Sequence, residues 1–246
     1  MFAYQAPADL LKDKVILVTG AGDGIGRCAA LTYAQHGASV ILLGRTVSKL
    51  ESVYDEIEAR GGATPAIVPL DMKGATRQHY RDMAQTIIDQ FGRLDGLLHN
   101  AGLLGVMSPF AHIDEKSWND VMQVNVSAQL WMTQGLLPAL LKAEQPSIVF
   151  TSSGVGRKGR AFWGSYAISK FATEGMAQVL ADEYEGSPLR VNVINPGGTR
   201  TAMRAKAYPA ENANKLPTPE DIMPLYLYLM GDDSIGTHGQ SLDAQG

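Results

Sequence analysis

The stretch Val15–Gly26, VILVTGAGDGIG, decides the fold of this chain. Its first five residues are typical of a strand buried on both faces, and a helical pattern follows its glycines. Glycines at such a turn let backbone N–H groups approach a pyrophosphate, and the helix N-terminus adds partial positive charge. The spacing is Thr-Gly-x-x-x-Gly-x-Gly rather than G-x-G-x-x-G. A glycine-rich turn can also serve only close helix–strand packing, but its place at the first strand–helix junction favours dinucleotide binding. The positions expected to contact a dinucleotide here are Gly20, Gly22, Asp23, Gly24, Ile25 and Gly26.

Short apolar runs alternate with helical patterns along the rest of the chain. The expected strands are Val15–Thr19, Ser39–Leu43, Ala66–Leu70, Gly96–His99, Ser147–Thr151, Arg190–Ile194 and about 239–243. The expected helices span about 25–36, 46–60, 73–91, 115–143, 164–185 and 219–230. This alternation predicts βαβ units with right-handed crossovers. We therefore expect an α/β fold: one doubly wound Rossmann-type domain over residues 1–246, with a seven-stranded, mostly parallel sheet and helices on both faces.

The composition excludes several classes of protein. The chain has 246 residues, 45% of them hydrophobic, and a formal net charge of −4, so it lacks the basic field of a nucleic-acid-binding protein. It has no run of 18 apolar residues and no apolar leader, which predicts neither a membrane span nor a secretory signal. Cys28 is the single cysteine and the five histidines are scattered, so we expect no metal site. This cysteine usage fits a reducing, cytoplasmic location.

The end of the second expected strand bears on the choice of dinucleotide. An NAD site normally has an acidic residue there, which holds the ribose 2′-hydroxyl. Here Gly44 takes that place, followed by Arg45 and Thr46. Because an arginine fork binds a 2′-phosphate that an acid would repel, we expect NADP(H) rather than NAD(H). Two alternatives stay open: Arg45 could be a solvated loop residue, and Asp23 in the glycine loop argues mildly against a phosphate.

A tyrosine and a lysine form the candidate catalytic pair. Tyr166 and Lys170 are four residues apart on an expected helix, so they share a face. A nearby ammonium stabilises a phenolate, which lets such a tyrosine exchange a proton with a carbonyl or alcohol oxygen. Ser153 ends an expected buried strand, where ligands of parallel sheets bind. Each signal alone is weak, and Ser153 alone reads as a helix cap or turn residue.

In combination these residues resemble the short-chain dehydrogenases/reductases, in the branch of ordinary rather than extended length. The resemblance covers the whole chain in order. Residues 146–204 and 219–233 look especially like the YciK-type oxidoreductases within that family. Its further carriers are Leu70-Asp71, Asn100-Ala101-Gly102, Asn125 and Pro196-Gly197.

The resemblance implies a role for each matching residue. Tyr166 is the general acid/base, Ser153 polarises the substrate oxygen, and Lys170 lowers the pKa of Tyr166 and binds the nicotinamide ribose. Asn125 holds a water that extends the proton relay. The remaining implied cofactor contacts are Asp71 and Met72 at the adenine, Asn100 with Ala101 and Gly102, Pro196 and Gly197 along the nicotinamide, and Thr199 at its carboxamide. From the residues alone, Asn125 could equally satisfy buried backbone groups, and Asp71 could be a turn residue.

The predicted activity is hydride transfer between NADP(H) and a small-molecule carbonyl or alcohol. Segment 196–218, rich in proline and glycine, is expected to be an irregular substrate loop that acts as a lid. Leu103, Leu104, Met107, Phe162 and Trp163 are candidates for an apolar substrate wall, or else for core or subunit contacts. The basic residues Arg157, Lys158 and Arg160 read as a solvated loop rather than as a site for an acidic substrate.

Two other functions are alternatives to hydride transfer, and the sequence argues against both. The fold could serve as an NADP(H)-binding sensor or scaffold without turnover, against which the set of Asn125, Ser153, Tyr166 and Lys170 argues. A sugar epimerase would carry a larger C-terminal substrate domain. The resemblance implies a homodimer or homotetramer that pairs the helices at 115–143 and 164–185.

Overall fold

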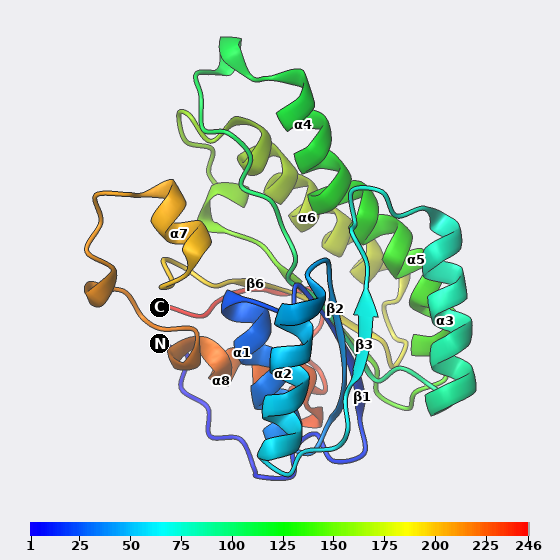
Figure 1. The fold of residues 1–246 in the computed structure, drawn as a ribbon. Helices are drawn as coiled ribbons and strands as arrows, with labels where there is room; N and C mark the ends of the chain where they lie inside the picture. Colours follow the sequence, from blue (N-terminus) through cyan, green and yellow to red (C-terminus); the bar gives the residue numbers. More distant parts are fainter. Residues whose placement is uncertain (246) are drawn as a thin grey trace.

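Seven strands form one sheet, and the computed structural model describes it together with the rest of residues 1–245. The strands are β1 (Val15–Thr19), β2 (Ser39–Gly44), β3 (Ala66–Pro69), β4 (Gly96–His99), β5 (Ser147–Thr151), β6 (Arg190–Asn195) and β7 (Ser241–Asp243). They lie in the order β3-β2-β1-β4-β5-β6-β7, and each neighbouring pair is parallel (Figure 1). The expected Rossmann-type sheet is confirmed and is parallel throughout. Gly246, the last residue of the expected domain, lies outside the described residues.

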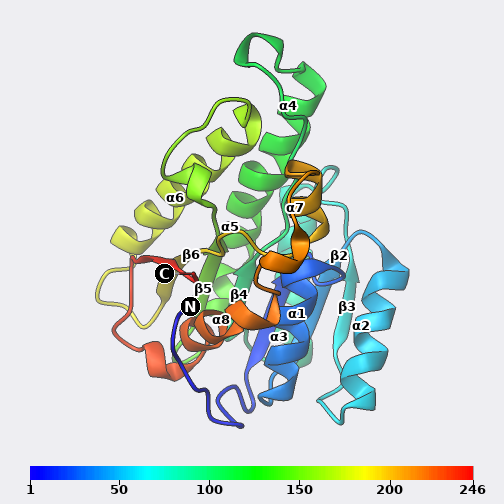
Figure 2. The same ribbon diagram turned by 90° about the vertical axis from the view of Figure 1, so that its left-hand side faces the viewer.

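Helices cover both faces of the sheet, as the continuously apolar strands require. In β1, Ile16 and Val18 face one core, while Val15 and Leu17 face the other. The first core is closed by α1 (Gly24–Gln35), α2 (Val47–Ala59) and α8 (Met223–Met230). The second is closed by α3 (Arg77–Phe91), α5 (Ala128–Leu140) and α6 (Gly164–Glu183), as Figures 1 and 2 show. Among the described residues, no helix has the length and apolar composition needed to cross a membrane.

The expected helix at 115–143 is interrupted. The structure has α4 (Glu115–Met122), then a π turn at Gln123–Ser127, then α5. In the π turn the N–H of Ala128 donates to the carbonyl of Gln123, five residues earlier instead of four. Such turns occur mostly as single insertions within α-helices, frequently at functional sites. Asn125 lies in the middle of this one.

Segment 196–218 is more regular than expected. It contains α7 (Ala202–Ala207), whose first turn is capped by Thr201 accepting from the N–H of Arg204 at 3.2 Å. The guanidinium of Arg200 donates to the carbonyls of Ala213 at 2.8 Å and Leu216 at 3.2 Å, which closes the segment on itself. The expectation of an irregular loop is therefore wrong at α7, and its role as a lid stays a prediction.

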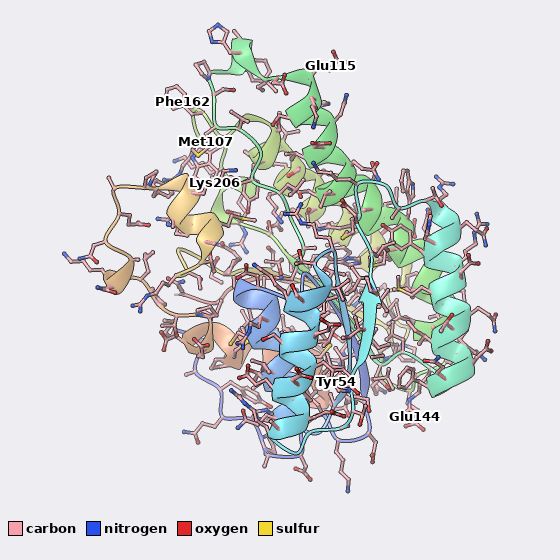
Figure 3. All side chains as sticks on the ribbon, viewed as in Figure 1. Tyr54, Met107, Glu115, Glu144, Phe162 and Lys206 are labelled. Atoms are coloured by element: carbon pink, nitrogen blue, oxygen red, sulfur yellow. The ribbon has the colours of Figure 1, made fainter. Side chains whose placement is uncertain are left out.

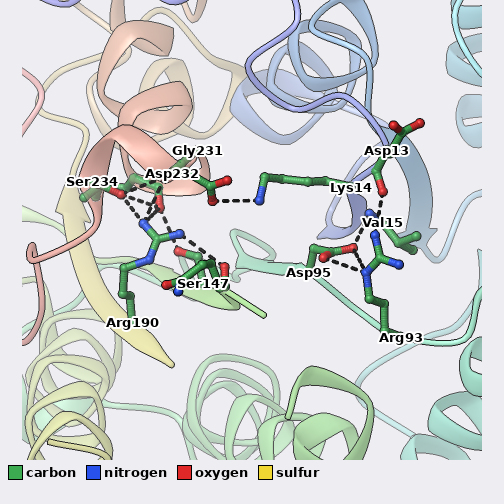
Figure 4. A network of polar contacts seen from close by, with 12 residues as sticks. Asp13, Lys14, Val15, Arg93, Asp95, Ser147, Arg190, Gly231, Asp232 and Ser234 are labelled. Atoms are coloured by element: carbon green, nitrogen blue, oxygen red, sulfur yellow. Dashed lines mark hydrogen bonds and ion pairs between the residues drawn. The ribbon is translucent and has the colours of Figure 1, made fainter. Parts of the chain in front are cut away.

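Buried polar contacts gather at the amino ends of the strands (Figure 4). Arg190, which is 4% exposed, donates to the carbonyl of Gly231 at 3.0 Å and to the Ser234 hydroxyl. Asp95 accepts from the N–H of Val15 at 2.8 Å and from Arg93 at 2.9 Å. These groups tie strands and helix ends together there, at the end of the sheet opposite the cleft described below.

Candidate active site

A cleft of about 490 Å³ opens at the carboxyl ends of the strands. Its walls are the turns that follow β1 to β6, where ligands of parallel α/β sheets bind. Two of the predicted site residues, Gly26 and Asn125, do not line the cleft. The predicted residues that do line it are Gly20, Gly22, Asp23, Gly24, Ile25, Arg45, Thr46, Asp71, Met72, Asn100, Ala101, Gly102, Ser153, Tyr166, Lys170, Pro196, Gly197 and Thr199.

Gly26 lies behind the glycine loop and allows the loop to form. A Cβ at this position would lie 2.3 Å from the carbonyl oxygen of Gly20 and 2.5 Å from Nδ2 of Asn100. Gly20 itself has a φ of +69°, a backbone conformation that favours glycine. The loop thus presents bare backbone to the cleft because α1 starts in direct contact with the turn after β1.

Charge in the glycine loop is balanced by a residue that the sequence analysis missed. Asp23 caps α1 by accepting from the N–H of Gly24 at 2.8 Å, and its carboxylate pairs with Lys49 in the first turn of α2. The ion pair with Lys49 lowers the pKa of Asp23, with a smaller contribution from the Gly24 N–H. The mild objection that Asp23 raised against a phosphate is therefore weakened. Nothing in the local sequence marks Lys49, because only the packing of α2 beside α1 brings it there.

Arg45 follows β2 and lines the cleft without a carboxylate partner. No ion pair or side-chain hydrogen bond of Arg45 is present among residues 1–245, whereas Lys49 pairs with Asp23 and Lys73 with Asp120 at 2.6 Å. Gly44 beside it holds no side chain that would compete. Arg45 is therefore free to meet an anionic group.

Asn100 and Thr19 join β4 to β1 at the floor of the cleft. The Thr19 hydroxyl accepts from the N–H of Asn100 at 2.9 Å and of Ala101 at 3.0 Å, and the Asn100 amide donates to the Thr19 carbonyl at 3.2 Å. Asp71 lines the cleft and also accepts from the N–H of Lys73 at 3.0 Å. The turn role that Asp71 could have is thus present, together with its exposure to the cleft.

Tyr166 and Lys170 come from one face of α6 and meet Ser153 from the end of β5. The Lys170 ammonium lies 5.5 Å from the centre of the Tyr166 ring and donates to the Thr151 carbonyl at 2.8 Å. Both side chains are almost fully buried, at 8% and 3% exposure. Burial raises the pKa of Tyr166 to about 12, against a lowering interaction with Ser153, and burial lowers the pKa of Lys170 to about 8, against the charge of Glu174.

Asn125 is fully buried behind Tyr166 and Lys170, the candidate catalytic pair. Its side-chain oxygen accepts from the N–H of Leu103 at 2.7 Å, and its amide donates to the carbonyl of the same residue at 2.9 Å and to Ser169 at 2.9 Å. The structural role considered for Asn125 is therefore present: it anchors the segment after β4 to the π turn. Its oxygen also lies 3.4 Å from the position that a Cβ on Gly102 would take, beside Lys170.

The turn after β6 is supported by the C-terminal segment. The Gln245 amide donates to the carbonyl of Pro196 at 2.8 Å and to the hydroxyl of Thr199 at 3.3 Å. Gly197 has a φ of +71°, and a Cβ there would lie 2.8 Å from the Gln245 side chain. The sequence offered no signal for this contact, because it joins residues almost fifty positions apart.

In the basic loop after Ser153, Lys158 and Arg160 are exposed as predicted, but Arg157 is not simply solvated. Arg157 pairs with Asp243 at 2.8 Å and with the buried Glu174 at 3.4 Å, and donates to Ser241 at 2.7 Å. It fastens the loop to β7 and α6. Of the proposed apolar wall, Leu103, Leu104 and Trp163 line the cleft, whereas Met107 and Phe162 do not.

Comparison with known proteins places this arrangement in a family. Residues 14–212 match the short chain dehydrogenase family. The chain is 59% identical over 242 residues to the uncharacterized oxidoreductase YciK of Escherichia coli K12, covering 98% of this chain and 96% of that protein. A protein of Shigella flexneri 2a strain 301, solved in complex with NADP, is 58% identical with a TM-score of 0.95, covering 98% of this chain and 100% of that chain. A protein of Escherichia coli CFT073, solved in complex with NADPH, is 59% identical with a TM-score of 0.96 at the same coverage. The chain therefore belongs to the short-chain dehydrogenase family.

Proposed function

We propose that this protein is an NADP(H)-dependent oxidoreductase that interconverts a carbonyl and an alcohol on a small molecule. The observation that carries the cofactor choice is Arg45, which lines the cleft after β2 without a carboxylate partner among residues 1–245. The relatives solved with NADP and NADPH support the same choice. Gly26 supports dinucleotide binding independently, because a Cβ there would push the loop away from the backbone geometry that a pyrophosphate needs.

The residues that line the cleft fit each part of such a cofactor. The loop Gly20–Gly24 would hold the pyrophosphate, Arg45 and Thr46 the 2′-phosphate, and Asp71 with Met72 the adenine. Asn100 to Gly102 would lie along the cofactor, with Pro196, Gly197 and Thr199 beside the nicotinamide. When bound, NADPH supplies the hydride that reduces the carbonyl carbon.

The chain's own residues would supply the proton and stabilise charge. In reduction, Tyr166 donates its hydroxyl proton to the carbonyl oxygen, and the Ser153 hydroxyl donates a hydrogen bond to that oxygen as charge develops. Burial keeps Tyr166 protonated at neutral pH, since its pKa is raised to about 12. Lys170, 5.5 Å from the ring centre, stabilises the tyrosinate left behind, and it is mostly protonated at pH 7 because its pKa is about 8. The reverse reaction uses the same groups with Tyr166 as the base.

Turnover with a matched variant tests this proposal. We expect the wild type to oxidise NADPH, followed at 340 nm, when offered members of a panel of aldehydes and ketones. Tyr166→Phe should lower kcat at least about a hundredfold, in line with the usual contribution of a general acid, while its NADPH Kd stays within about twofold. A variant with near-normal kcat would contradict the role of Tyr166. Tight NADPH binding without turnover of any carbonyl would support the sensor or scaffold function instead.

We also propose that the protein forms a homo-oligomer through α5 and α6. Leu130 on α5 and Ile168, Phe171 and Val179 on α6 are apolar and between 36% and 61% exposed. Met132, on the same helix as Leu130, lies in the core at 0% exposure and takes no part in this contact. Sedimentation equilibrium should give a dimer or tetramer, and a monomer at micromolar concentration would contradict the proposal.

A further inference from the structure

Phe162 combines two unfavourable features next to the cleft. Its φ is +73°, and Asp13 is the only other non-glycine residue with a positive φ in the described part of the chain. The N–H of Trp163 donates to the carbonyl of Arg160 at 3.3 Å, so Phe162 occupies the third position of a turn that normally takes glycine or asparagine. The Phe162 side chain is also 58% exposed. Backbone strain of this kind persists where the surrounding structure enforces it and is concentrated at functional sites.

The strained turn places aromatic side chains at the mouth of the cleft. The N–H of Ser108 donates to the carbonyl of Phe162 at 3.1 Å, which joins the turn to the segment after β4. Figure 3 shows Phe162 and Met107 near each other at this end of the molecule, above Lys206 of α7. The next residue, Trp163, lines the cleft with its ring centre 5.8 Å from that of Tyr166 and 5.7 Å from that of Tyr208.

The wall around Tyr166 is apolar. Leu104, Val155 and Ala167 pack with Tyr166 as a cluster, and Trp163 and Ala207 lie against it. The substrate side of the cleft is therefore formed by Leu104, Trp163, Met203 and Ala207 as well as by the catalytic residues.

None of the cations that line the substrate side of the cleft is free, whereas Arg160 and Lys206 form no ion pair among residues 1–245 but do not line the cleft. Arg204 is held by Glu211 through two contacts of 2.6 and 2.7 Å, and it stacks on Tyr208 at 3.9 Å. Lys73 pairs with Asp120, and Lys170 is committed to catalysis. The carboxylates that line the cleft are Asp23 and Asp71, both among the residues proposed to hold the cofactor.

We propose that the substrate is an uncharged carbonyl or alcohol compound that carries an apolar group beside the reacting carbon. That group lies against Trp163, and its outer part contacts the exposed ring of Phe162. In the complex, the substrate would cover the exposed Phe162 ring and remove it from water. This inference rests on the proposed function and narrows it to a substrate class.

Benzaldehyde and two para-substituted benzaldehydes test the substrate class. We expect kcat/KM with NADPH to rise about tenfold from benzaldehyde to 4-propylbenzaldehyde, since three buried methylenes contribute at most about sixtyfold and the mouth is half open. We expect 4-carboxybenzaldehyde to fall at least about tenfold below benzaldehyde, because its carboxylate would be partly desolvated against an apolar wall where no lining cation is free to pair with it. A carboxylate that is turned over as well as the propyl compound would overturn the inference while leaving the oxidoreductase function standing.

Binding of unreactive amides keeps the two proposals separate. The complex of enzyme and NADPH is titrated with 4-propylbenzamide and 4-carboxybenzamide, with cofactor fluorescence as the readout. Tighter binding of the propyl amide, without turnover of any aldehyde, would support the substrate class and contradict hydride transfer. Equal binding of the two amides, or no binding of either, would overturn the substrate class.

Phe162→Asn tests the role of the strained turn. Asparagine tolerates a positive φ, so we expect the melting temperature to rise by about 2–4 °C. We also expect kcat/KM for 4-propylbenzaldehyde to fall about three- to tenfold through KM, while benzaldehyde turnover and the NADPH Kd stay within about twofold. The control is Ile235→Asn. Ile235 has a 57% exposed side chain and an ordinary φ of −56°, so this substitution should change neither the melting temperature nor kcat/KM. A Phe162→Asn variant with unchanged KM, or one whose only effect is on oligomeric state, would overturn the role of Phe162.

Discussion

Arg45→Ser should convert a preference for NADPH into near-equal binding of NADPH and NADH. Arg45 lines the cleft without a carboxylate partner among residues 1–245, and the substitution removes its charge without touching the Asp23–Lys49 pair. A hydrogen bond to a charged group is worth about 1.5–3 kcal/mol, which corresponds to about 10- to 150-fold in Kd. Because Arg45 is exposed and solvent screens its charge, we expect the lower part of that range, about 10- to 30-fold weaker NADPH binding. The NADH Kd should stay within about twofold.

The assay is a fluorescence titration of each cofactor into wild type, Arg45→Ser and a matched control. The control is Arg60→Ser, which removes an exposed arginine at the opposite end of α2 where it pairs with Glu56. Raising the salt concentration should weaken NADPH binding to the wild type more than NADH binding, and this difference should vanish in Arg45→Ser. The reasoning is refuted if Arg45→Ser weakens NADH as much as NADPH, or if it leaves the ratio of the two Kd values unchanged.

Two further substitutions examine the nicotinamide end of the cleft and the buried lysine. Gln245→Ala removes the hydrogen bonds to Pro196 and Thr199, so NADPH Kd should rise about two- to tenfold with little change in melting temperature, and an unchanged Kd would show that the contact does not position the turn. For Lys170, the folded-state pKa of about 8 lies below the usual 10.5, so the unfolded chain binds more protons between these values and wild-type stability should rise with pH in that window. The measurement is urea denaturation of wild type and Lys170→Met without cofactor. From pH 7.5 to 9.5, the free energy of unfolding of the wild type should rise by about 2 kcal/mol relative to that of the variant. A difference that stays constant with pH would contradict the burial of a charged Lys170.

The strands and the glycine loop were readable from the sequence because their physical causes are local. A strand covered on both faces has to be apolar at nearly every position, and Val15–Thr19 shows this directly. The positive φ of Gly20 and the close backbone contact at Gly26 both require glycine, and glycine is recognisable in the sequence. The helix at 73–91 was placed too early, because Asp71 and Gly74 form a turn before Thr76 caps α3.

The parts that sequence reasoning missed depend on contacts between distant elements. Lys49 matters only because α2 lies beside the start of α1, and Gln245 only because the C-terminal segment returns to β6. Arg157 was read as solvated because its partners, Glu174 and Asp243, lie on α6 and β7. The positive φ of Phe162 is invisible in the sequence, since phenylalanine is not a residue that turn rules place there.

The π turn around Asn125 makes this helix intolerant of changes in length. Across this turn, α4 buries Val121 and α5 presents Met132 and Leu136 to the second core. Deleting a residue within α5 ahead of Met132 would rotate the rest of that helix by about 100°. A deletion within the π turn would restore a regular helix at the same register, because the wide turn absorbs the extra residue. The first deletion would turn Met132 and Leu136 out of the core, and the second would pull Asn125 away from Leu103. Descendants of this sequence can therefore lose a residue from the π turn only together with the Asn125 anchor, and lose one from α5 only together with the packing of Met132 and Leu136.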